Sequence, residues 1–320
     1  MKRMPILTAV VLTSAIAGFA GLLTDLNRVS ADDAGAASAE VSTESAASAP
    51  SNEAVALLRQ SRNELFARKS VRAKLQETVS MGDRKFRASG SYTAGQFPKL
   101  RLEFDVEVGK TTGTLKEICD GSLLWTEQAI KSADDEAPTV QVSRTVIDDV
   151  LSAVAESGDN PEALLIAGLG VGGVPALLAG LERAMVFEAL KSDQAGGREY
   201  SVIQGRWNDV YLTRFGGAGG RPLPNFVPDR VRIYIDQETL FPTRVLYLKQ
   251  IADEQGAETS RKYRSMLSLE FSEIVLDGPV SEEDFRYLPP TDVETRDRTK
   301  EFLDLIEQAN RSAETAGETP

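Results

Sequence analysis

The sequence predicts an α+β protein in which an antiparallel sheet curves into an incomplete β-barrel and helices cover its concave face. The first observation is the segment from Leu100 to Val108, where apolar residues alternate with charged ones. This period of two gives a strand one apolar face and one hydrated face. The second is Asp120-Gly121, which favours a tight hairpin because such turns need positive φ angles. The third is a change to helical spacing between about residues 143 and 190, which predicts a helical insertion between two groups of strands.

The N-terminus predicts export. A short basic segment, residues 1–4, precedes an uncharged apolar run from Pro5 to Leu23, as in a secretory signal peptide. Val29-Ser30-Ala31 offers a cleavage site, but the apolar run is also long enough for an uncleaved membrane anchor. Residues 1–31 are therefore predicted to be a signal peptide or an N-terminal anchor, and the protein to be periplasmic or otherwise extracytoplasmic. Residues 32–50, rich in Ala, Ser and Glu, are predicted to form a disordered linker.

The folded domain is expected to cover residues 51–311. Ser51 is a suitable N-cap for a helix whose apolar residues fall on one face. Strands follow, with turns at residues 81–83, at Phe97-Pro98 and at Asp120-Gly121. The expected strands of this first group are residues 71–79, 86–92, 100–108, 115–118 and 123–125.

The insertion at about 143–190 is predicted to be a helical lid. One helix should follow Ser143 and stop at Gly158, and two more should begin at Asn160-Pro161 and Val174-Pro175, with proline in the first turn. The apolar residues that recur at helical spacing in the first helix are Val142, Val146, Val150, Leu151 and Val154.

A glycine-rich apolar segment joins these helices. Gly168, Gly170 and Gly173 match the dinucleotide fingerprint Gly-x-Gly-x-x-Gly, with Glu188 near the position of a ribose ligand. That fingerprint needs a preceding parallel strand, whereas antiparallel strands are expected on both sides here. A flexible joint is the favoured interpretation. The predicted lid hinge consists of Gly168, Gly170, Gly172 and Gly173.

Strands resume after the insertion. The clearest hairpin has Val231, Ile233 and Ile235 on one face, and it turns at Asp236. The loop at residues 215–228, rich in Gly and Pro, is either a mobile lip or, as we favour, a surface excursion. A last helix is expected after Asp292, followed by a disordered tail at 312–320. The expected strands of this second group are residues 199–207, 231–235, 245–251 and 263–276.

Composition limits the function. The 320 residues, 42% of them apolar, can bury a full core, and acidic residues outnumber basic ones 48 to 36 without a basic stripe. Nucleic acid is therefore not an expected partner. The chain has no histidine, the commonest general base and zinc ligand. We expect no enzyme activity, no catalytic residue, no metal site and no cofactor, and a monomeric protein. The single Cys119 cannot form an intramolecular disulfide and is expected to be a small buried residue.

Several short motifs resemble the periplasmic LolA/LolB-like lipoprotein carrier superfamily. They are Phe97-Pro98 before the strand at Leu100, Asp120-Gly121 before Leu124-Trp125, the strand pair from Val231 to Leu248, and the ending from Phe271 to Pro290. The resemblance covers most of residues 53–295. It implies a half-open barrel whose apolar concave face, covered by helices, receives the acyl chains of a lipoprotein or another lipid.

Two functional hypotheses follow. The leading one is an exported carrier that binds a lipid or an acylated protein and has a membrane of the cell envelope as a further partner. The alternative is a structural or interaction protein of the envelope with a self-filled core. A third, an enzyme using the paired carboxylates Asp148-Asp149 or Glu282-Glu283, is weakest, because adjacent helical residues point apart. The candidate cavity residues are Leu102, Phe104, Trp125, Val146, Val150, Leu178, Ile233, Leu246, Leu269 and Phe271.

Overall fold

The structure is a computed structural model. It describes residues 41–44, 51–81, 84–158, 160, 163–164, 166, 170–215, 217, 221–251 and 261–317. The predicted signal or anchor at residues 1–31 lies outside this part of the chain.

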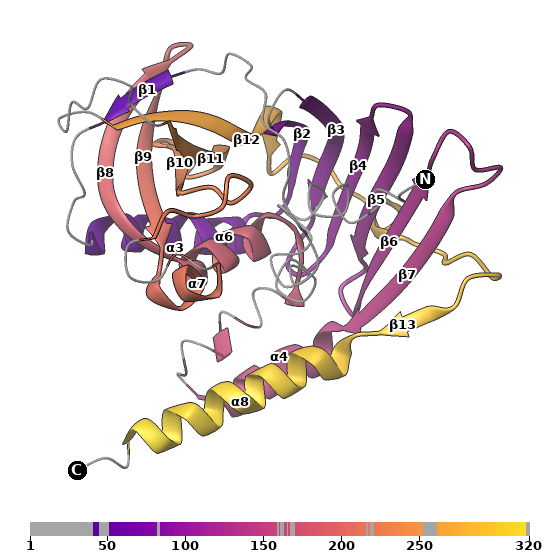
Figure 1. The fold of residues 1–320 in the computed structure, drawn as a ribbon. Coiled ribbons are helices and arrows are strands. Elements are labelled where there is room, and N and C mark those ends of the chain that lie inside the picture. The colour runs from indigo at the N-terminus through magenta and orange to yellow at the C-terminus, as the bar shows by residue number, and fades with distance from the viewer. Residues whose placement is uncertain are drawn as a thin grey trace.

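The described strands form one large curved sheet that stays open (Figure 1). The first group contains β2 (Val71–Met81), β3 (Arg84–Ala94), β4 (Leu100–Val108), β5 (Thr111–Cys119), β6 (Leu123–Lys131) and β7 (Thr139–Val146). The second contains β8 (Met185–Ala195), β9 (Arg198–Trp207), β10 (Arg230–Asp236), β11 (Pro242–Ile251) and β12 (Arg261–Leu276). Two short strands, β1 (Val41–Glu44) and β13 (Thr295–Asp297), complete the sheet.

The strand order explains why the barrel is incomplete. The order is β13-β7-β6-β5-β4-β3-β2-β12-β11-β10-β9-β8, with β1 paired to β12 beside this path. Strands β8 and β13 are the two edges and do not pair with each other. The pairs are antiparallel except that β13 runs parallel to β7. The predicted fold class, an incomplete barrel with helices against it, is confirmed, and the sheet is mixed at its β13 edge.

Glycine allows two of the strands to approach closely. Gly90 on β3 faces Phe104 on β4, and a Cβ at Gly90 would collide with the carbonyl oxygen of Glu103. A residue without a side chain is therefore required at this place.

The helices form two groups (Figure 1). Helix α3 (Asn52–Ala67) packs against α6 (Gly173–Ala184) and β8. It begins as predicted at Ser51, whose hydroxyl accepts a hydrogen bond from the backbone N–H of Ala54. Helix α4 (Ile147–Glu156) packs against α8 (Thr299–Gly317), and these two run side by side away from the rest. A short helix α7 (Asp209–Arg214) and a 3-10 turn η3 (Glu282–Phe285) lie in connections.

The insertion is shorter than the predicted range of about 143–190. Strand β7 continues to Val146 and β8 begins at Met185, so the helical part runs from Ile147 to Ala184. Val142 and Val146 are four residues apart, a spacing that fits the period of a strand as well as that of a helix. Pairing with β6 decides in favour of the strand.

Two predicted boundaries near the termini also differ. Residues 41–44, inside the predicted linker 32–50, form β1 on β12, which offers free backbone groups there. Helix α8 extends to Gly317, into the predicted tail 312–320. It begins at Thr299, where Asp297 rather than Asp292 accepts the hydrogen bond from the backbone N–H.

The loop before β10 is fastened to the sheet. The Lys249 ammonium donates to the carbonyl oxygens of Leu223, Pro224 and Val227, each at 3.0 Å. The indole N–H of Trp207 donates to the carbonyl of Pro228 at 2.6 Å. These bonds support the interpretation of this loop, where it is described, as a surface excursion.

Candidate ligand site on the concave face

The concave face of the sheet is apolar. On β4, Leu100, Leu102, Phe104 and Val106 are all buried and belong to the main core cluster, as the alternation predicts. Residues of β10, β11 and β12 join the same cluster from the other group of strands. The two groups therefore share one continuous apolar surface.

The structure brings together six of the ten predicted cavity residues. The six that share the main cluster are Leu102, Phe104, Leu178, Ile233, Leu269 and Phe271.

The other four predicted cavity residues lie elsewhere. Leu246 packs with Leu248 and Tyr263 in a separate cluster. Val150 belongs to the cluster between α4 and α8. Trp125 lies against the ring of Tyr287, with centroids 5.5 Å apart, and Val146, at the end of β7, is partly exposed.

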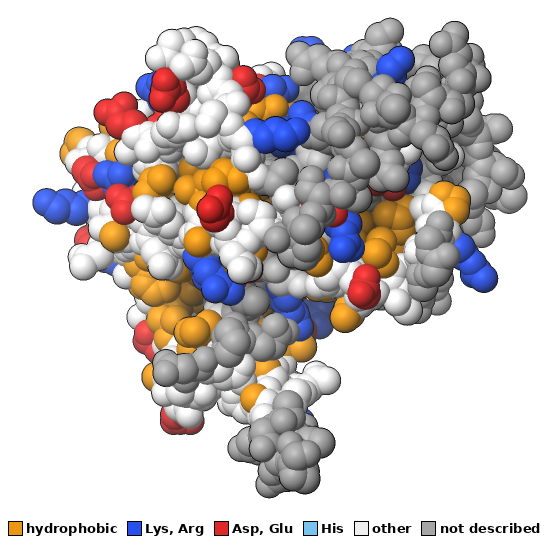
Figure 2. Space-filling model, turned by 90° about the vertical axis from the view of Figure 1, so that its left-hand side faces the viewer, with side chains coloured by type: hydrophobic (Ala, Val, Ile, Leu, Met, Phe, Trp, Pro, Cys, Tyr) orange, Lys and Arg blue, Asp and Glu red, His pale blue; other side chains and the backbone are white. Residues whose placement is uncertain are grey.

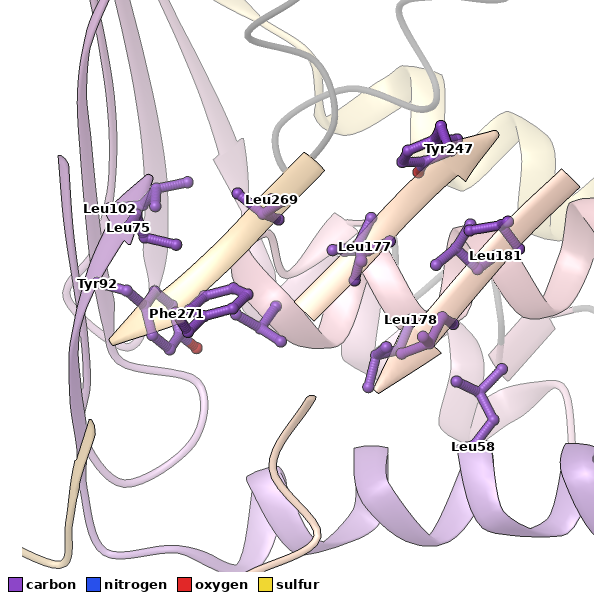
Figure 3. Close-up of a cluster of buried hydrophobic side chains, with 14 of the residues drawn as sticks. Leu58, Leu75, Tyr92, Leu102, Leu177, Leu178, Leu181, Tyr247, Leu269 and Phe271 are labelled. Atoms are coloured by element: carbon purple, nitrogen blue, oxygen red, sulfur yellow. The ribbon is translucent and has the colours of Figure 1, made fainter. Parts of the chain in front are cut away.

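Helix α6 occupies the concave space in this structure. Leu177, Leu178 and Leu181 are at most 2% exposed and belong to the same core cluster as Leu269 and Phe271 of β12. In Figure 3, Leu177 lies between Leu269 and Leu181. A helix that is apolar on all sides is stable only when it is buried. The side chains of α6 thus fill the place where the sequence analysis expects a guest molecule.

A buried ion pair holds the C-terminal end of α6. Glu182 is only 7% exposed and accepts hydrogen bonds from Arg59 at 2.5 Å and from Arg62 at 2.6 Å, both on α3. The Arg62 side chain is 17% exposed, whereas that of Arg59 is 56% exposed, so the pair with Arg62 is the less screened by solvent and the stronger of the two. This contact fastens α6 to α3 rather than to the sheet.

A buried carboxylate holds the N-terminal end of α6. Glu117 of β5 accepts a hydrogen bond from the backbone N–H of Gly173 at 3.3 Å. Burial raises the pKa of Glu117 to about 7, although the Gly173 bond works in the opposite direction. A negative charge is favourable at a helix N-terminus, so the position at the start of α6 offsets part, but not all, of the desolvation that disfavours the ionised form of Glu117.

The predicted hinge glycines lie at this same end. Gly172 and Gly173 have φ angles of 76° and 66°, a region that L residues rarely adopt. Gly170 packs against Val150 and Phe302, between α4 and α8. Gly168 lies outside the described residues. The hinge role itself remains a prediction.

Sequence reasoning missed a second buried carboxylate, Glu77 of β2. Val71, Ala73, Leu75 and Val79 are buried, and Glu77 takes the one polar place in this alternating row. Its side chain is 3% exposed, and burial raises its pKa to about 8. Within the described residues, Oε1 of Glu77 has no hydrogen-bond partner. The signal was present in the sequence, because Glu77 is in phase with the apolar residues of its strand.

Tyr247 of β11 lies across β12 from Glu77. Its hydroxyl is also buried and, among the described residues, without a hydrogen-bond partner. Burial and the nearby charge of Glu77 both raise the pKa of Tyr247. A buried polar atom left without a partner costs about 1–3 kcal/mol, so this pair of groups is unusual within an otherwise apolar face.

A small crevice opens beside Glu77. Its interior offers about 10 Å³ to the centre of a water molecule, about the space that one water needs. In this structure the crevice therefore has no room for part of a lipid. Its lining residues are Glu77, Val79, Phe86, Arg87, Ala88 and Val106.

The dinucleotide alternative fails on topology. Strands β7 and β8 flank the insertion but lie at opposite ends of the strand order, so they form no βαβ unit with α6. Glu188, the expected ribose ligand, accepts hydrogen bonds from Arg206 at 2.7 Å and Arg230 at 2.5 Å.

Surface charge, helix hydrophobicity and possible metal ligands limit which partners the described part of the chain can bind. On the face in Figure 2, basic side chains are scattered among acidic ones. None of the helices in the described ranges is both long and apolar enough to span a bilayer. Among the same residues, His, Cys, Asp and Glu side chains do not gather in a group that could hold a metal ion.

The fold and this face define the class: an incomplete β-barrel with an apolar concave surface under a helix. No family model and no curated protein matches the sequence. Among solved structures, the chain is similar to a DUF1329 family protein from Desulfovibrio piger, with 9% identity, a TM-score of 0.32, and coverage of 74% of this chain and 98% of that one. The lipoprotein LppX of Mycobacterium tuberculosis gives 14% identity, a TM-score of 0.32, and coverage of 72% and 99%.

A LolA superfamily protein from Nitrosomonas europaea gives 10% identity, a TM-score of 0.25, and coverage of 73% and 97%. Because these identities and TM-scores are low, we base the functional proposal on the residues of this chain.

Proposed function

We propose that this protein is an exported, non-enzymatic carrier that binds an apolar ligand, a lipid or the acyl chain of a lipoprotein, on its concave face. The observation that carries the proposal is α6, an apolar helix that lies on this face and begins at two glycines with positive φ angles. In this proposal α6 is a displaceable cover, and the structure is the closed state.

The free energy of apolar burial allows a ligand to replace α6 on the concave face. Moving α6 away exposes apolar surface of the sheet, and an acyl chain can cover that surface again. Each methylene that leaves water contributes about 0.8 kcal/mol. The ligand therefore needs no charged anchor to compete with the helix, provided that the fastenings at Glu117 and Glu182 are weak enough to open.

The proposed partners follow from the export signal that the N-terminus predicts. The donor and the acceptor would be a membrane of the cell envelope or an acylated protein at its surface. Candidate contact residues are the six cavity residues of the main cluster, and the candidate hinge glycines are Gly168, Gly170, Gly172 and Gly173.

The test is ligand retention and uptake. Lipids extracted from the purified protein are identified by mass spectrometry, and uptake of a fluorescent fatty acid is measured. We expect bound lipid or saturable uptake, and stronger uptake in Glu182→Gln, because this change loosens α6 from Arg59 and Arg62.

Asp304→Asn is the matched control. It breaks an ion pair with Lys300 on the exposed side of α8, far along the chain from α6, and should leave uptake unchanged. If neither the wild type nor Glu182→Gln carries or takes up lipid, the carrier proposal fails. The alternative, a structural or interaction protein whose core α6 fills permanently, would then be favoured.

A further inference from the structure

Two buried polar side chains on the concave face, Glu77 and Tyr247, each have an atom without a hydrogen-bond partner among the described residues. On β2, every second side chain faces the core, and Glu77 is the polar residue in this row. On β11, Val245 and Tyr247 are the neighbouring residues that face the core. Both strands pair with β12: Glu77 faces Leu269, and Tyr247 faces Leu267. The two side chains therefore lie on the same face of the sheet, on either side of β12 and offset by two residues along it.

The two groups act on each other but do not satisfy each other. The charge of Glu77 affects Tyr247, yet within the described chain neither Glu77 Oε1 nor the Tyr247 hydroxyl has a hydrogen-bond partner. Glu77 also lines the crevice together with Val79, Phe86, Ala88 and Val106. Tyr247 is not part of this lining and lies on the other side of β12. Polar atoms in a protein interior are nearly always paired, and two exceptions on one face of the sheet indicate a missing partner.

We propose that Glu77 and Tyr247 bind the polar head of the ligand, and that this head is a neutral group with both a donor and an acceptor, such as a hydroxyl. This inference rests on the proposed function and names its ligand class. A hydroxyl donates to Glu77 Oε1 and accepts from the Tyr247 hydroxyl. The chain of the ligand follows the apolar face from which α6 has moved.

The charges of the site argue against an anionic head. Arg87 is the one cation of the crevice lining, but it alternates with Phe86 and Ala88 along β3, so its side chain belongs to the opposite face. No cationic group contributes to the shifted pKa of Glu77, which burial alone accounts for. An anionic head would thus be buried without a counter-ion, which is unfavourable.

The experiment compares ligands that share one chain and differ in the head. Dodecanol, dodecanoate, dodecylamine and dodecane compete with a fluorescent lipophile for the full-length protein at neutral pH. We expect dodecanol to bind more tightly than dodecanoate. Tyr247→Phe and Glu77→Leu should each weaken dodecanol binding about 3- to 10-fold, the effect of one net hydrogen bond, and leave dodecane binding unchanged. Glu77→Gln, which keeps a donor and an acceptor, should retain dodecanol binding.

Tyr263→Phe is the matched control. The Tyr263 hydroxyl accepts a hydrogen bond from Arg230 at 2.8 Å, so this change should lower stability without affecting dodecanol. Tyr247→Phe should leave the stability of the ligand-free protein unchanged or raise it, since it removes an unpaired hydroxyl. A loss of stability as large as that of Tyr263→Phe would show that Tyr247 is already paired and would overturn the inference.

The outcomes separate the inference from the proposed function. If no ligand of the series binds, the carrier proposal fails. If the chains bind but Tyr247→Phe and Glu77→Leu do not change the preference between heads, the head-group inference fails and the carrier proposal stands. Tighter binding of dodecanoate or dodecylamine than of dodecanol also overturns the inference.

Discussion

Glu117 of β5 accepts a hydrogen bond from the backbone N–H of Gly173, so a carboxylate of the sheet lies at the first residue of α6. Glu182, near the other end of the helix, is held by two arginines of α3. The helix that covers the concave face is thus fastened by a carboxylate at each end. A substitution at Glu117 or Glu182 should therefore weaken the attachment of α6 without altering the apolar surface beneath it.

Gly173→Ala should destabilise the N-terminal end of α6. The φ angle of 66° strains any L residue, and the new Cβ would lie 3.1 Å from the ring of Tyr92 and 3.2 Å from Leu100. We expect a loss of about 2–4 kcal/mol in the free energy of unfolding, measured by urea denaturation. Gly197→Ala is the control, because its φ of 78° is similar but no atom lies within 4 Å of the new Cβ. Equal losses in the two variants would show that Gly173 is not tightly packed.

Glu182→Gln should destabilise the protein by about 1–3 kcal/mol, since it removes the enclosed negative charge between Arg59 and Arg62. The same denaturation measurement on Asp304→Asn should give a change within about 0.5 kcal/mol, because its ion pair is exposed. Hydrogen exchange should be faster in α6 of Glu182→Gln. An unchanged exchange rate in α6 would mean that this ion pair does not hold the helix.

Stability should fall between about pH 4.5 and pH 8. Burial raises the pKa of Glu77 to about 8 and that of Glu117 to about 7 from 4.5. In this window the unfolded chain ionises both groups while the folded chain keeps them protonated. Each group then lowers the free energy of unfolding by up to about 1.4 kcal/mol per pH unit, until the pH passes its folded pKa.

Urea denaturation at pH 5 and pH 8 measures this slope. Glu77→Gln should reduce it, and the exposed Glu107→Gln should not. Asp277 does not interfere, because its pKa is lowered by hydrogen bonds from Lys69 and Arg68, and its contribution is lost only in more acidic solution. Equal slopes in the wild type and Glu77→Gln would contradict burial of an unpaired carboxyl.

Cys119 should resist thiol reagents in the folded protein. It is fully buried, and burial raises the pKa of its thiol to about 12, so almost no thiolate is present at pH 8. We expect negligible reaction with a disulfide reagent in buffer and one thiol per chain in urea. Because Cys119 belongs to the core cluster that contains α6, faster labelling in Gly173→Ala would report opening of this cover. Rapid labelling of the native wild type would contradict the packed core.

The sequence predicted the strands better than it predicted the polar groups. The alternation at Leu100–Val108 and at Val231–Ile235 appears directly as strands with one buried face. The spacing of Val142 and Val146 fits two periods, and only pairing with β6 made it a strand. Glu77 was in phase with the apolar row of β2, but the row could be recognised as inward only once β3 and β12 lay beside it.

The sequence by itself determined the class of fold, the position of the insertion and the exclusion of chemistry that depends on histidine. These follow from local periodicity and composition, which do not depend on distant contacts. The tertiary structure decided that α6 fills the concave space, that carboxylates hold it at both ends, and that Glu77 and Tyr247 lie on one face on either side of β12. The physical reason is that burial and hydrogen bonding are properties of neighbours in space, and these neighbours come from segments more than fifty residues apart.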